Sequence, residues 1–272
     1  GGTEFSMTDG DRTEVGTTIT LFLNEESVEF ANEYRAREVI QKYCSFMPTE
    51  FYLSKADAEG EPEAINETTP LWSKHPNDCT KEEYLEFYRK VFQDYKEPLF
   101  WIHLNMDYPF NLKGILYFPK INMEYESIEG QVKLYYNQVF VADNIKEVIP
   151  EYLLMLRGVL DCPELPLNVS RSYLQNSGYV SKISAHIVKK TADKLCGIFN
   201  TEREKFEGFW KDIKVFCEYG SMKDRKFFDR IKNIILFEKT DGKFLTAEEY
   251  IENAKDKYSL TGNYIKVTEC FA

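Results

Sequence analysis

The pattern of apolar and polar positions predicts a strand, a helix and a loop in the first quarter of the chain. Apolar and polar residues alternate over residues 15–23, which is typical of a β-strand. Over residues 27–43 the apolar positions approximate helical spacing, and Ser27 can cap the N-terminus, so we expect a helix there. Residues 51–53 predict a short strand, and residues 54–69, rich in Glu, Ala, Gly and Pro without periodicity, predict a loop.

The middle of the chain predicts a helix followed by several strands. Thr80 and Glu83 have the spacing of a capping box, in which each side chain accepts a hydrogen bond from the other residue's backbone N–H. This motif predicts a helix that runs to about Tyr95. Runs of apolar, β-branched and aromatic residues then predict strands at 99–104, 113–118 and 132–141, a helical turn at 143–150 and an apolar element at 153–160.

The last part of the chain predicts helices and short strands. A long helix is expected from Arg171 to about Phe199. Later signals are two capping boxes, Thr201–Glu204 and Thr246–Glu249, and two short strands, 233–238 and 264–267. A chain of 272 residues corresponds to one large or two modest domains.

These elements together predict an α/β fold of the mixed α+β kind. We expect a larger αβα sandwich over residues 15–190, a helical connector over 191–230 and a smaller α/β subdomain over 231–272. The chain begins at Gly1 instead of Met and ends without a capping pattern. We therefore expect it to be a piece of a longer protein.

Composition excludes several classes of protein. With 43% apolar and 29% charged residues, the chain is neither disordered nor fibrous. Its net charge of −11, without a dense block of Lys and Arg, argues against binding of nucleic acid. The most apolar run, residues 149–160, is too short and is interrupted by charged residues, so we expect no membrane association. Six dispersed cysteines without paired spacing indicate reduced thiols and a cytoplasmic location.

Generic catalytic and metal-binding motifs are absent from the sequence. It contains neither a phosphate-binding glycine loop, nor a nucleophile elbow, nor a zinc-protease motif. His75, His103 and His186 have no metal-ligand spacing, and we expect no metal site. A small-molecule enzyme is disfavoured because no acid, base and nucleophile come together in the sequence.

The segment from Pro166 to Gln175 is the most informative. Asn168 and Ser170 are good caps for a helix that opens at Arg171. An arginine in the first turn of a helix lies at the positive end of the helix dipole, which costs about 0.3–1 kcal/mol. This cost is explained if Arg171 binds an anion that comes from outside the chain, with Gln175 on the same helix face. The alternative is an ordinary exposed arginine.

This segment resembles the catalytic loop in the middle domain of the ninety-kilodalton heat-shock chaperone family, and most closely that of its bacterial branch. The likeness extends in order over residues from about 13 to 200. It is carried by Val15-Gly-Thr-x-Ile19, Tyr34-Arg-x-Arg-Glu-Val-Ile40, Ile65-Asn-x-Thr-x-Pro-Leu-Trp72, Thr80-Lys-Glu-Glu-Tyr84, Leu116-Tyr-Phe-Pro-Lys120, Lys133-Leu-Tyr135, Val139-Phe140, Ile149-Pro-Glu-Tyr-Leu153 and Pro166-Leu-Asn-Val-Ser-Arg171.

The resemblance implies a half-site for ATP hydrolysis. The family binds ATP with Mg²⁺ in a separate N-terminal domain, so this piece alone is expected to hold no cofactor. On closure of that domain, Arg171 would reach the γ-phosphate and Gln175 would support the closed arrangement. Asn168 and Ser170 would shape the loop, and Phe140 would pack beneath it. Residues 1–14 would be the tail of the ATP-binding domain or a linker.

The resemblance also implies protein partners. The intact protein would be a homodimer through a C-terminal dimerisation domain, and the isolated piece a monomer. Unfolded client proteins would bind at Trp72, which we expect to be exposed, and at a loop containing Met123 and Tyr125. The alternative for Trp72 is that it folds back onto its own helix.

Two departures from the family pattern bear on these expectations. Gln138 stands where the family usually has a basic residue, which weakens a second charge for phosphate or docking. The loop at residues 121–126 is more acidic than in the family, which puts its client surface in doubt. A scaffold that binds proteins without ATP chemistry remains the alternative function.

Overall fold

The computed structural model describes residues 5–55, 62–109, 111–120, 131–144, 148–153, 155–165 and 178–255. The α-helices in these residues are α1 (Glu33–Cys44), α2 (Lys81–Phe92), α3 (Gly178–Thr201), α4 (Arg203–Lys223), α5 (Arg225–Ile231) and α6 (Ala247–Lys255). The strands are β1 (Phe100–Met106), β2 (Leu112–Phe118), β3 (Gln131–Tyr136), β4 (Val139–Asp143), β5 (Arg157–Asp161), β6 (Leu236–Glu238) and β7 (Phe244–Thr246). Short 3₁₀ helices lie at Glu25–Ala31, Leu71–Ser73, Pro76–Asp78, Glu151–Leu153 and Lys232–Ile234. The expected mixed α/β class is confirmed.

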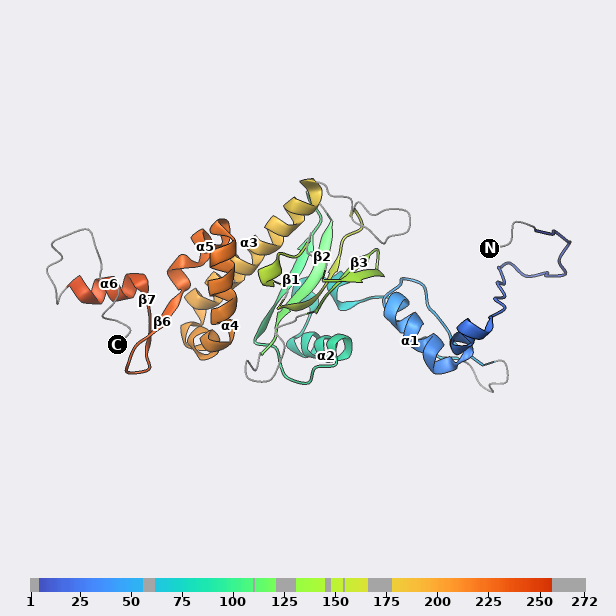
Figure 1. The fold of residues 1–272 in the computed structure, drawn as a ribbon, viewed down its shortest axis with the longest axis horizontal. Helices are drawn as coiled ribbons and strands as arrows, with labels where there is room; N and C mark the ends of the chain where they lie inside the picture. The colour runs from blue at the N-terminus through green and yellow to red at the C-terminus, as the bar shows by residue number, and fades with distance from the viewer. Residues whose placement is uncertain are drawn as a thin grey trace.

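The centre of the molecule is a five-stranded sheet with the order β1-β2-β5-β3-β4. Strands β3 and β5 are parallel, and the other neighbouring pairs are antiparallel. The sheet separates α1 on one side of the molecule from β6, β7 and α6 on the other (Figure 1). Since β5 is the middle strand, its last residue, Asp161, lies in the interior of the fold.

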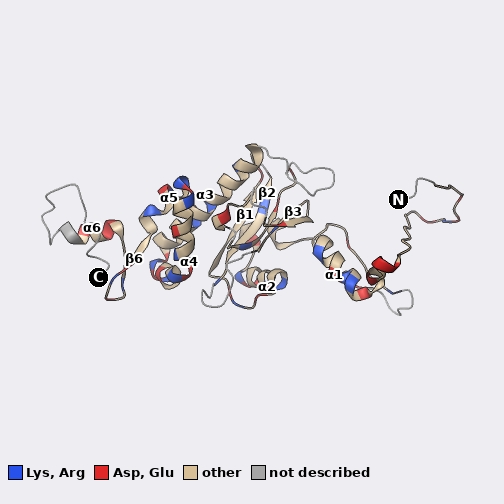
Figure 2. Ribbon diagram, viewed as in Figure 1, with Lys and Arg blue, Asp and Glu red and all other residues tan. Residues whose placement is uncertain are grey.

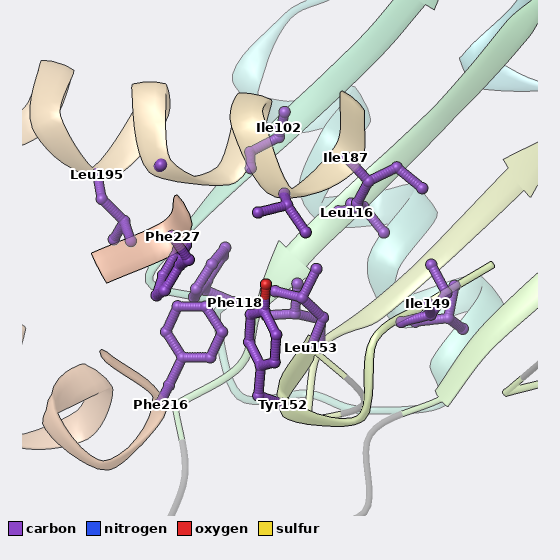
Figure 3. Close-up of a cluster of buried hydrophobic side chains, with 14 of the residues drawn as sticks. Ile102, Leu116, Phe118, Ile149, Tyr152, Leu153, Ile187, Leu195, Phe216 and Phe227 are labelled. Atoms are coloured by element: carbon purple, nitrogen blue, oxygen red, sulfur yellow. The ribbon is translucent and has the colours of Figure 1, made fainter. Parts of the chain in front are cut away.

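Both faces of the sheet are covered. Alternate residues of β2 point to opposite faces: Leu116 and Phe118 join a core with α3, α4 and α5, whereas Ile115 and Tyr117 join a second core with α2. Figure 3 shows the first core, where Ile187 of α3, Phe216 of α4 and Phe227 of α5 meet side chains of the sheet. Helices on both faces confirm the expected αβα arrangement.

Two glycines allow β2 and β5 to approach each other. A Cβ atom on Gly114 would lie 2.3 Å from the carbonyl oxygen of Val159, and one on Gly158 would lie 2.7 Å from that of Ile115. Both distances are shorter than any real contact, so only glycine fits at these two positions. The close pairing of β2 and β5 therefore requires glycine at both positions.

Two of the three predicted capping boxes are formed. At α2, the backbone N–H of Thr80 donates to Glu83 over 2.7 Å, and that of Glu83 donates to the Thr80 hydroxyl over 3.2 Å. Thr246 and Glu249 make the same pair of bonds at α6. The box predicted at Thr201 is wrong: Thr201 ends α3, and its hydroxyl donates to the carbonyl of the preceding turn.

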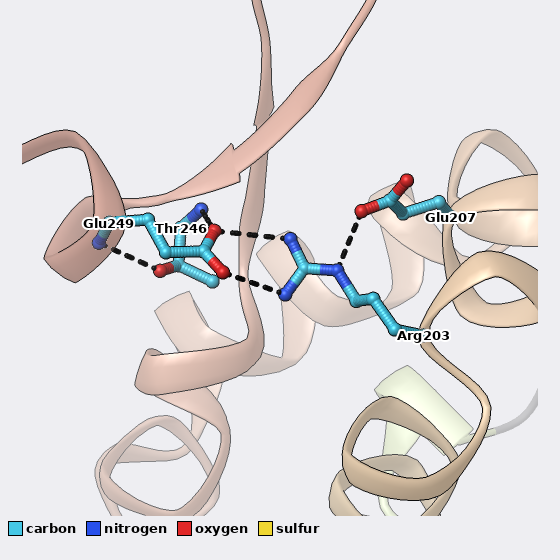
Figure 4. A network of polar contacts seen from close by, with 4 residues as sticks. All are labelled: Arg203, Glu207, Thr246 and Glu249. Carbon is cyan, nitrogen blue, oxygen red and sulfur yellow. Dashed lines mark hydrogen bonds and ion pairs between the residues drawn. The ribbon is translucent and has the colours of Figure 1, made fainter. Parts of the chain in front are cut away.

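The capping box at α6 is also linked to α4. The guanidinium of Arg203, the first residue of α4, donates to both carboxylate oxygens of Glu249 at 3.1 and 3.2 Å. Its Nε donates to Glu207 over 2.6 Å, as Figure 4 shows. One arginine thereby joins the start of α4 to the start of α6.

The strand predicted at residues 15–23 is not present. These residues form no strand in the described structure, and Ile19, Leu21 and Phe22 are 79%, 77% and 94% exposed. An alternating segment becomes a strand only when a neighbouring strand pairs with it, and no described segment does so here.

Three other predictions need adjustment. The helix expected over 27–43 is interrupted at Asn32, whose side chain caps α1 by accepting from the backbone N–H of Tyr34. The strand expected over 132–141 is the β3–β4 hairpin, because Asn137 and Gln138 adopt positive φ angles and turn the chain. Residues 51–53 make only one bridge, between Tyr52 and Ala64.

Charged side chains are interspersed by sign on the helices. Figure 2 shows Lys and Arg alternating with Asp and Glu along α4 and α5. Several of them pair within a helix, such as Lys214 with Glu218 and Arg225 with Asp229. Among the described residues, no helix has the length and apolar character needed to cross a bilayer.

Candidate functional site

The site is built around the C-terminal end of β5. Asp161, the last residue of that strand, is 7% exposed. Its Oδ2 accepts a hydrogen bond from the indole N–H of Trp72 over 3.2 Å and from the backbone N–H of Gln138 over 3.0 Å. The carboxylate thereby joins three segments: the loop before α2, the β3–β4 turn and the central strand.

This carboxylate is chemically unusual. Burial raises the pKa of Asp161 above its ordinary value, and the donated hydrogen bonds and the charge of Lys113 oppose that shift only in part. Its second oxygen, Oδ1, is buried and has no hydrogen-bond partner in the described residues. The sequence analysis did not single out Asp161. The available signal was a carboxylate at the end of the apolar run Gly158-Val159-Leu160.

Residues 166–177 follow β5 in the sequence and precede α3, and the two stems of this segment are joined. On the first stem, Leu165 is 4% exposed in the larger core; on the second, Val180 is 3% exposed. The hydroxyl of Tyr179 donates to the carboxylate of Glu164 over 2.6 Å, which links the stems directly. Burial raises the pKa of Tyr179, and the hydrogen bond to this carboxylate raises it further.

The residues predicted for the catalytic loop itself, Asn168, Ser170, Arg171 and Gln175, lie outside the described residues. Phe140 is described: it is 9% exposed in β4, and its ring packs against Tyr135 and Tyr43 at centroid distances of 5.8 Å. The structure therefore places Phe140 on the same hairpin as Gln138, next to Asp161. Whether it lies beneath the loop stays a prediction.

The expected exposure of Trp72 is wrong. Trp72 is 1% exposed and lies in the second core, where its ring meets Phe46 at 4.7 Å, Tyr135 at 5.1 Å and Phe87 at 5.8 Å. Burial of the indole is favourable because its N–H donates a hydrogen bond to Asp161, which lies 89 residues later in the sequence. Trp72 is a structural residue and offers no surface to a client protein. Met123 and Tyr125 lie outside the described residues.

A polar pocket of about 720 Å³ is lined by Phe140 and lies between α1, α2 and the β3–β4 hairpin. Lys42 and Lys133 line it without an ion pair in the described part of the chain, whereas Lys90 pairs with Glu67 at 2.6 Å. Burial lowers the pKa of Lys133. Three carboxylates also line this pocket, so its lining has as many acidic as basic side chains.

No metal centre is present in the part of the chain that the structure describes: no group of three or more His, Cys, Asp or Glu side chains there is placed to hold a metal ion. The five cysteines in that part are free thiols. The described residues thus offer two joined stems, and a buried carboxylate that accepts a hydrogen bond from the turn of an aromatic hairpin.

Comparison with known proteins identifies the family. The model of the Hsp90 protein family matches residues 54–267, which is most of the chain. The chain therefore belongs to the Hsp90 family of chaperones, as the resemblance of its motifs predicted.

Bacterial members named HtpG are among its relatives. The chain is 43% identical to chaperone protein htpG of Bacteroides fragilis strain YCH46 over 264 residues, 94% of this chain and 39% of that protein. It is 43% identical to the HtpG of Porphyromonas gingivalis strain W83 over 258 residues, covering 92% and 38%. With the HtpG of Desulfitobacterium hafniense strain Y51 the identity is 33% over 247 residues, covering 89% and 39%. The chain thus spans about two fifths of the length of these relatives.

Proposed function

We propose that this chain is the middle domain of an ATP-dependent chaperone and supplies Arg171 to the γ-phosphate of ATP held by a separate N-terminal domain. The observation that carries the proposal is the pair of joined stems around residues 166–177, where Tyr179 bonds to Glu164 over 2.6 Å. Membership of the Hsp90 family adds the motif that contains Arg171.

The proposed chemistry suits an arginine on a segment whose two flanking stems are joined. Phosphoryl transfer depends on positioning and on stabilisation of developing charge, so a guanidinium brought in by a second domain is effective. Fixed stems reduce the conformational entropy that the segment loses when it closes on the nucleotide. Gln175 would support the closed state, and Asn168 and Ser170 would set the shape of the loop. Mg²⁺ and the nucleotide would be held by the other domain.

The test is substitution of Arg171 in the full-length protein. Arg171→Ala is expected to reduce ATP turnover at least about tenfold, which is about 1.4 kcal/mol of barrier, while nucleotide affinity stays unchanged. Arg171→Lys should recover little, because a point charge does not reproduce the planar guanidinium. Lys182→Ala is the matched control: it removes an exposed cation from the first turns of α3.

Two results would contradict the proposal. Turnover could survive in Arg171→Ala, or nucleotide affinity could fall together with turnover. A scaffold that works without ATP would show no ATP turnover in either form and would bind unfolded protein equally well in both.

We also infer the division into a sandwich over 15–190, a connector over 191–230 and a smaller subdomain over 231–272, within a homodimer. Client binding is proposed for the loop with Met123 and Tyr125. Tyr125→Ala is expected to weaken binding of an unfolded model protein and to leave the melting temperature unchanged, since surface substitutions usually cost less than about 0.5 kcal/mol. Equal binding by both forms would remove this loop from the client surface.

A further inference from the structure

The three histidines of the chain line a single pocket. His75 precedes the 3₁₀ helix Pro76–Asp78, His103 lies in β1, and His186 lies in α3. The pocket has a volume of about 220 Å³, and its remaining lining residues are Pro76, Leu104, Asn105, Met106 and Lys190. The fold therefore gathers every imidazole of the chain in one place.

The lining is cationic or neutral at every position. Lys190 and His75 are exposed at the rim, and His103 and His186 are half-buried. No carboxylate lines the pocket, and Lys190 makes no ion pair or hydrogen bond within the described ranges. The nearest acidic side chain on α3, Asp193, is one turn further along and lies 3.8 Å from Arg230. The positive charge at the pocket is therefore not neutralised locally.

Hydrogen bonds determine which ring nitrogens of the imidazoles can donate to a ligand. Nδ1 of His75 accepts from the backbone N–H of Asn77 over 3.2 Å, so Nε2 of that ring carries a proton and is a donor even in the neutral form. Nδ1 of His103 lies 2.7 Å from the hydroxyl of Tyr84, which holds that ring in place as the back wall. The donors at the rim are thus His75, Lys190 and the side-chain amide of Asn105.

Protonation of His103 and of His186 is unfavourable in the free protein. Burial lowers the pKa of His103, as does the neighbouring His75, while a hydrogen bond with the backbone of Trp72 acts in the opposite direction. Burial also lowers the pKa of His186, and so do Lys190 and Lys189, while Asp193 acts in the opposite direction. Each proton taken up adds a charge beside other cations, and an anion in the pocket would relieve that repulsion.

The arrangement does not suit a metal ion, because no group of three such side chains in the described structure is placed to coordinate one. From the geometry we propose that this pocket binds a small dianionic oxyanion of the phosphate or sulfate class, and binds it more tightly as the pH falls. A pocket of about 220 Å³ holds one tetrahedral ion with several waters, each of which occupies about 30 Å³. It is too small for a nucleotide.

Thermodynamic linkage makes this proposal quantitative. If the anion binds the protonated form of His186 tenfold more tightly than the neutral form, the bound anion raises the pKa of His186 by about one, because the coupling is reciprocal. Sulfate is the better first probe, since it stays fully ionised between pH 5 and 8. Any pH dependence of its binding then belongs to the protein.

The experiment is an NMR titration of the 272-residue chain with ¹⁵N-labelled histidine, whose spectrum contains only three imidazoles. Sodium sulfate is compared with sodium chloride at equal ionic strength, from pH 5.5 to 8. We expect sulfate to shift the His75 and His186 signals and to bind about tenfold more tightly at the low end of this range. Inorganic phosphate should compete with sulfate.

Two neighbouring lysines provide matched variants. Lys190→Gln is expected to weaken sulfate binding at least threefold, whereas Lys189→Gln, which removes the same charge from the same helix but does not line the pocket, should weaken it less than twofold. His75→Gln removes an exposed rim donor without touching the core. The proposal is overturned if sulfate shifts no imidazole signal beyond the effect of chloride, or if both lysine variants lose equal affinity.

Discussion

The contact between Trp72 and Asp161 allows a direct test of how the site is held together. Trp72→Phe keeps an aromatic ring in the second core but removes the indole N–H that donates to Asp161 over 3.2 Å. Only the backbone N–H of Gln138 then remains from the two hydrogen bonds that the described structure gives this carboxylate. The substitution therefore isolates a polar interaction inside an apolar cluster.

The expected loss is large because the acceptor is a buried carboxylate. A hydrogen bond to a charged group is worth about 1.5–3 kcal/mol, and the smaller ring leaves unfilled volume besides. We expect Trp72→Phe to lower the free energy of unfolding by at least about 2 kcal/mol and Trp72→Ala by about 3–5 kcal/mol. For a domain stabilised by about 5–15 kcal/mol, these are substantial fractions.

The loss should also depend on pH. Burial already holds the folded-state pKa of Asp161 above its ordinary value, and removal of a donor raises it further. A carboxyl whose pKa is raised by folding binds its proton more strongly in the folded state, so stability increases as the pH falls through the folded-state pKa toward the unfolded value. The difference between wild type and Trp72→Phe should therefore be larger at pH 8 than at pH 5.

The assay is urea denaturation at both pH values, followed by circular dichroism. Trp101→Phe is the control: Trp101 is half-buried and stacks on Tyr84 at 4.9 Å, but its indole N–H makes no hydrogen bond in the described residues. That variant should lose less than about 1 kcal/mol. Equal losses in the two variants would show that ring size, and not the bond to Asp161, explains the effect.

Three further predictions concern the rest of the fold. Gly114→Ala places a Cβ 2.3 Å from a backbone carbonyl of the neighbouring strand and should lower the free energy of unfolding by about 3 kcal/mol. Gly208→Ala in α4, where an added Cβ has nothing within 4 Å, should raise it by up to about 1 kcal/mol. Calorimetry of both variants measures these changes. Glu249→Gln weakens the ion pair with Arg203 and should speed amide hydrogen exchange in α6 about fivefold without changing the exchange of β2. Equal exchange rates of α6 in the variant and the wild type would refute this prediction. His103 has a folded-state pKa below its ordinary 6.5. As the pH falls from 6.5 toward that pKa, the unfolded state takes up the proton first, so the folded state loses stability. His103→Gln should therefore flatten the decline of the urea midpoint between pH 7.5 and 5.5.

Much of the fold was predictable because its signals are local. The capping box at Thr80 places both partners within four residues, so it needs no tertiary information, and α2 begins where predicted. The strands β1 and β2 were likewise predicted to within two residues, because both are apolar runs bounded by turns. The hairpin turn at Asn137 and Gln138 was missed, since neither residue is a glycine and both still adopt positive φ.

The candidate site was less predictable, since its contacts link residues far apart in the sequence. The motif around Arg171 could be recognised from the sequence, but the hydrogen bond that joins its two flanking stems could not. Glu164 and Tyr179 flank the segment at a distance of 15 residues, with nothing in either residue to indicate the other. Asp161 was missed for the same reason: a carboxylate at the end of an apolar run is ordinary until its donors are known.

The two clearest errors have one physical cause. Residues 15–23 alternate as a strand does but remain exposed, whereas Trp72 follows a polar stretch as a surface residue does but is buried. Alternation describes how a segment can pair, and flanking polarity describes how its neighbours are solvated; neither shows whether a partner is present. For Trp72 the partner is Asp161, 89 residues later, and the bond to it makes burial of the indole favourable. For residues 15–23 no described segment is the partner, so the apolar side chains of Ile19 and Phe22 stay in water. Sequence patterns thus specify the capacity of a segment to pack, and distant residues decide whether that capacity is used.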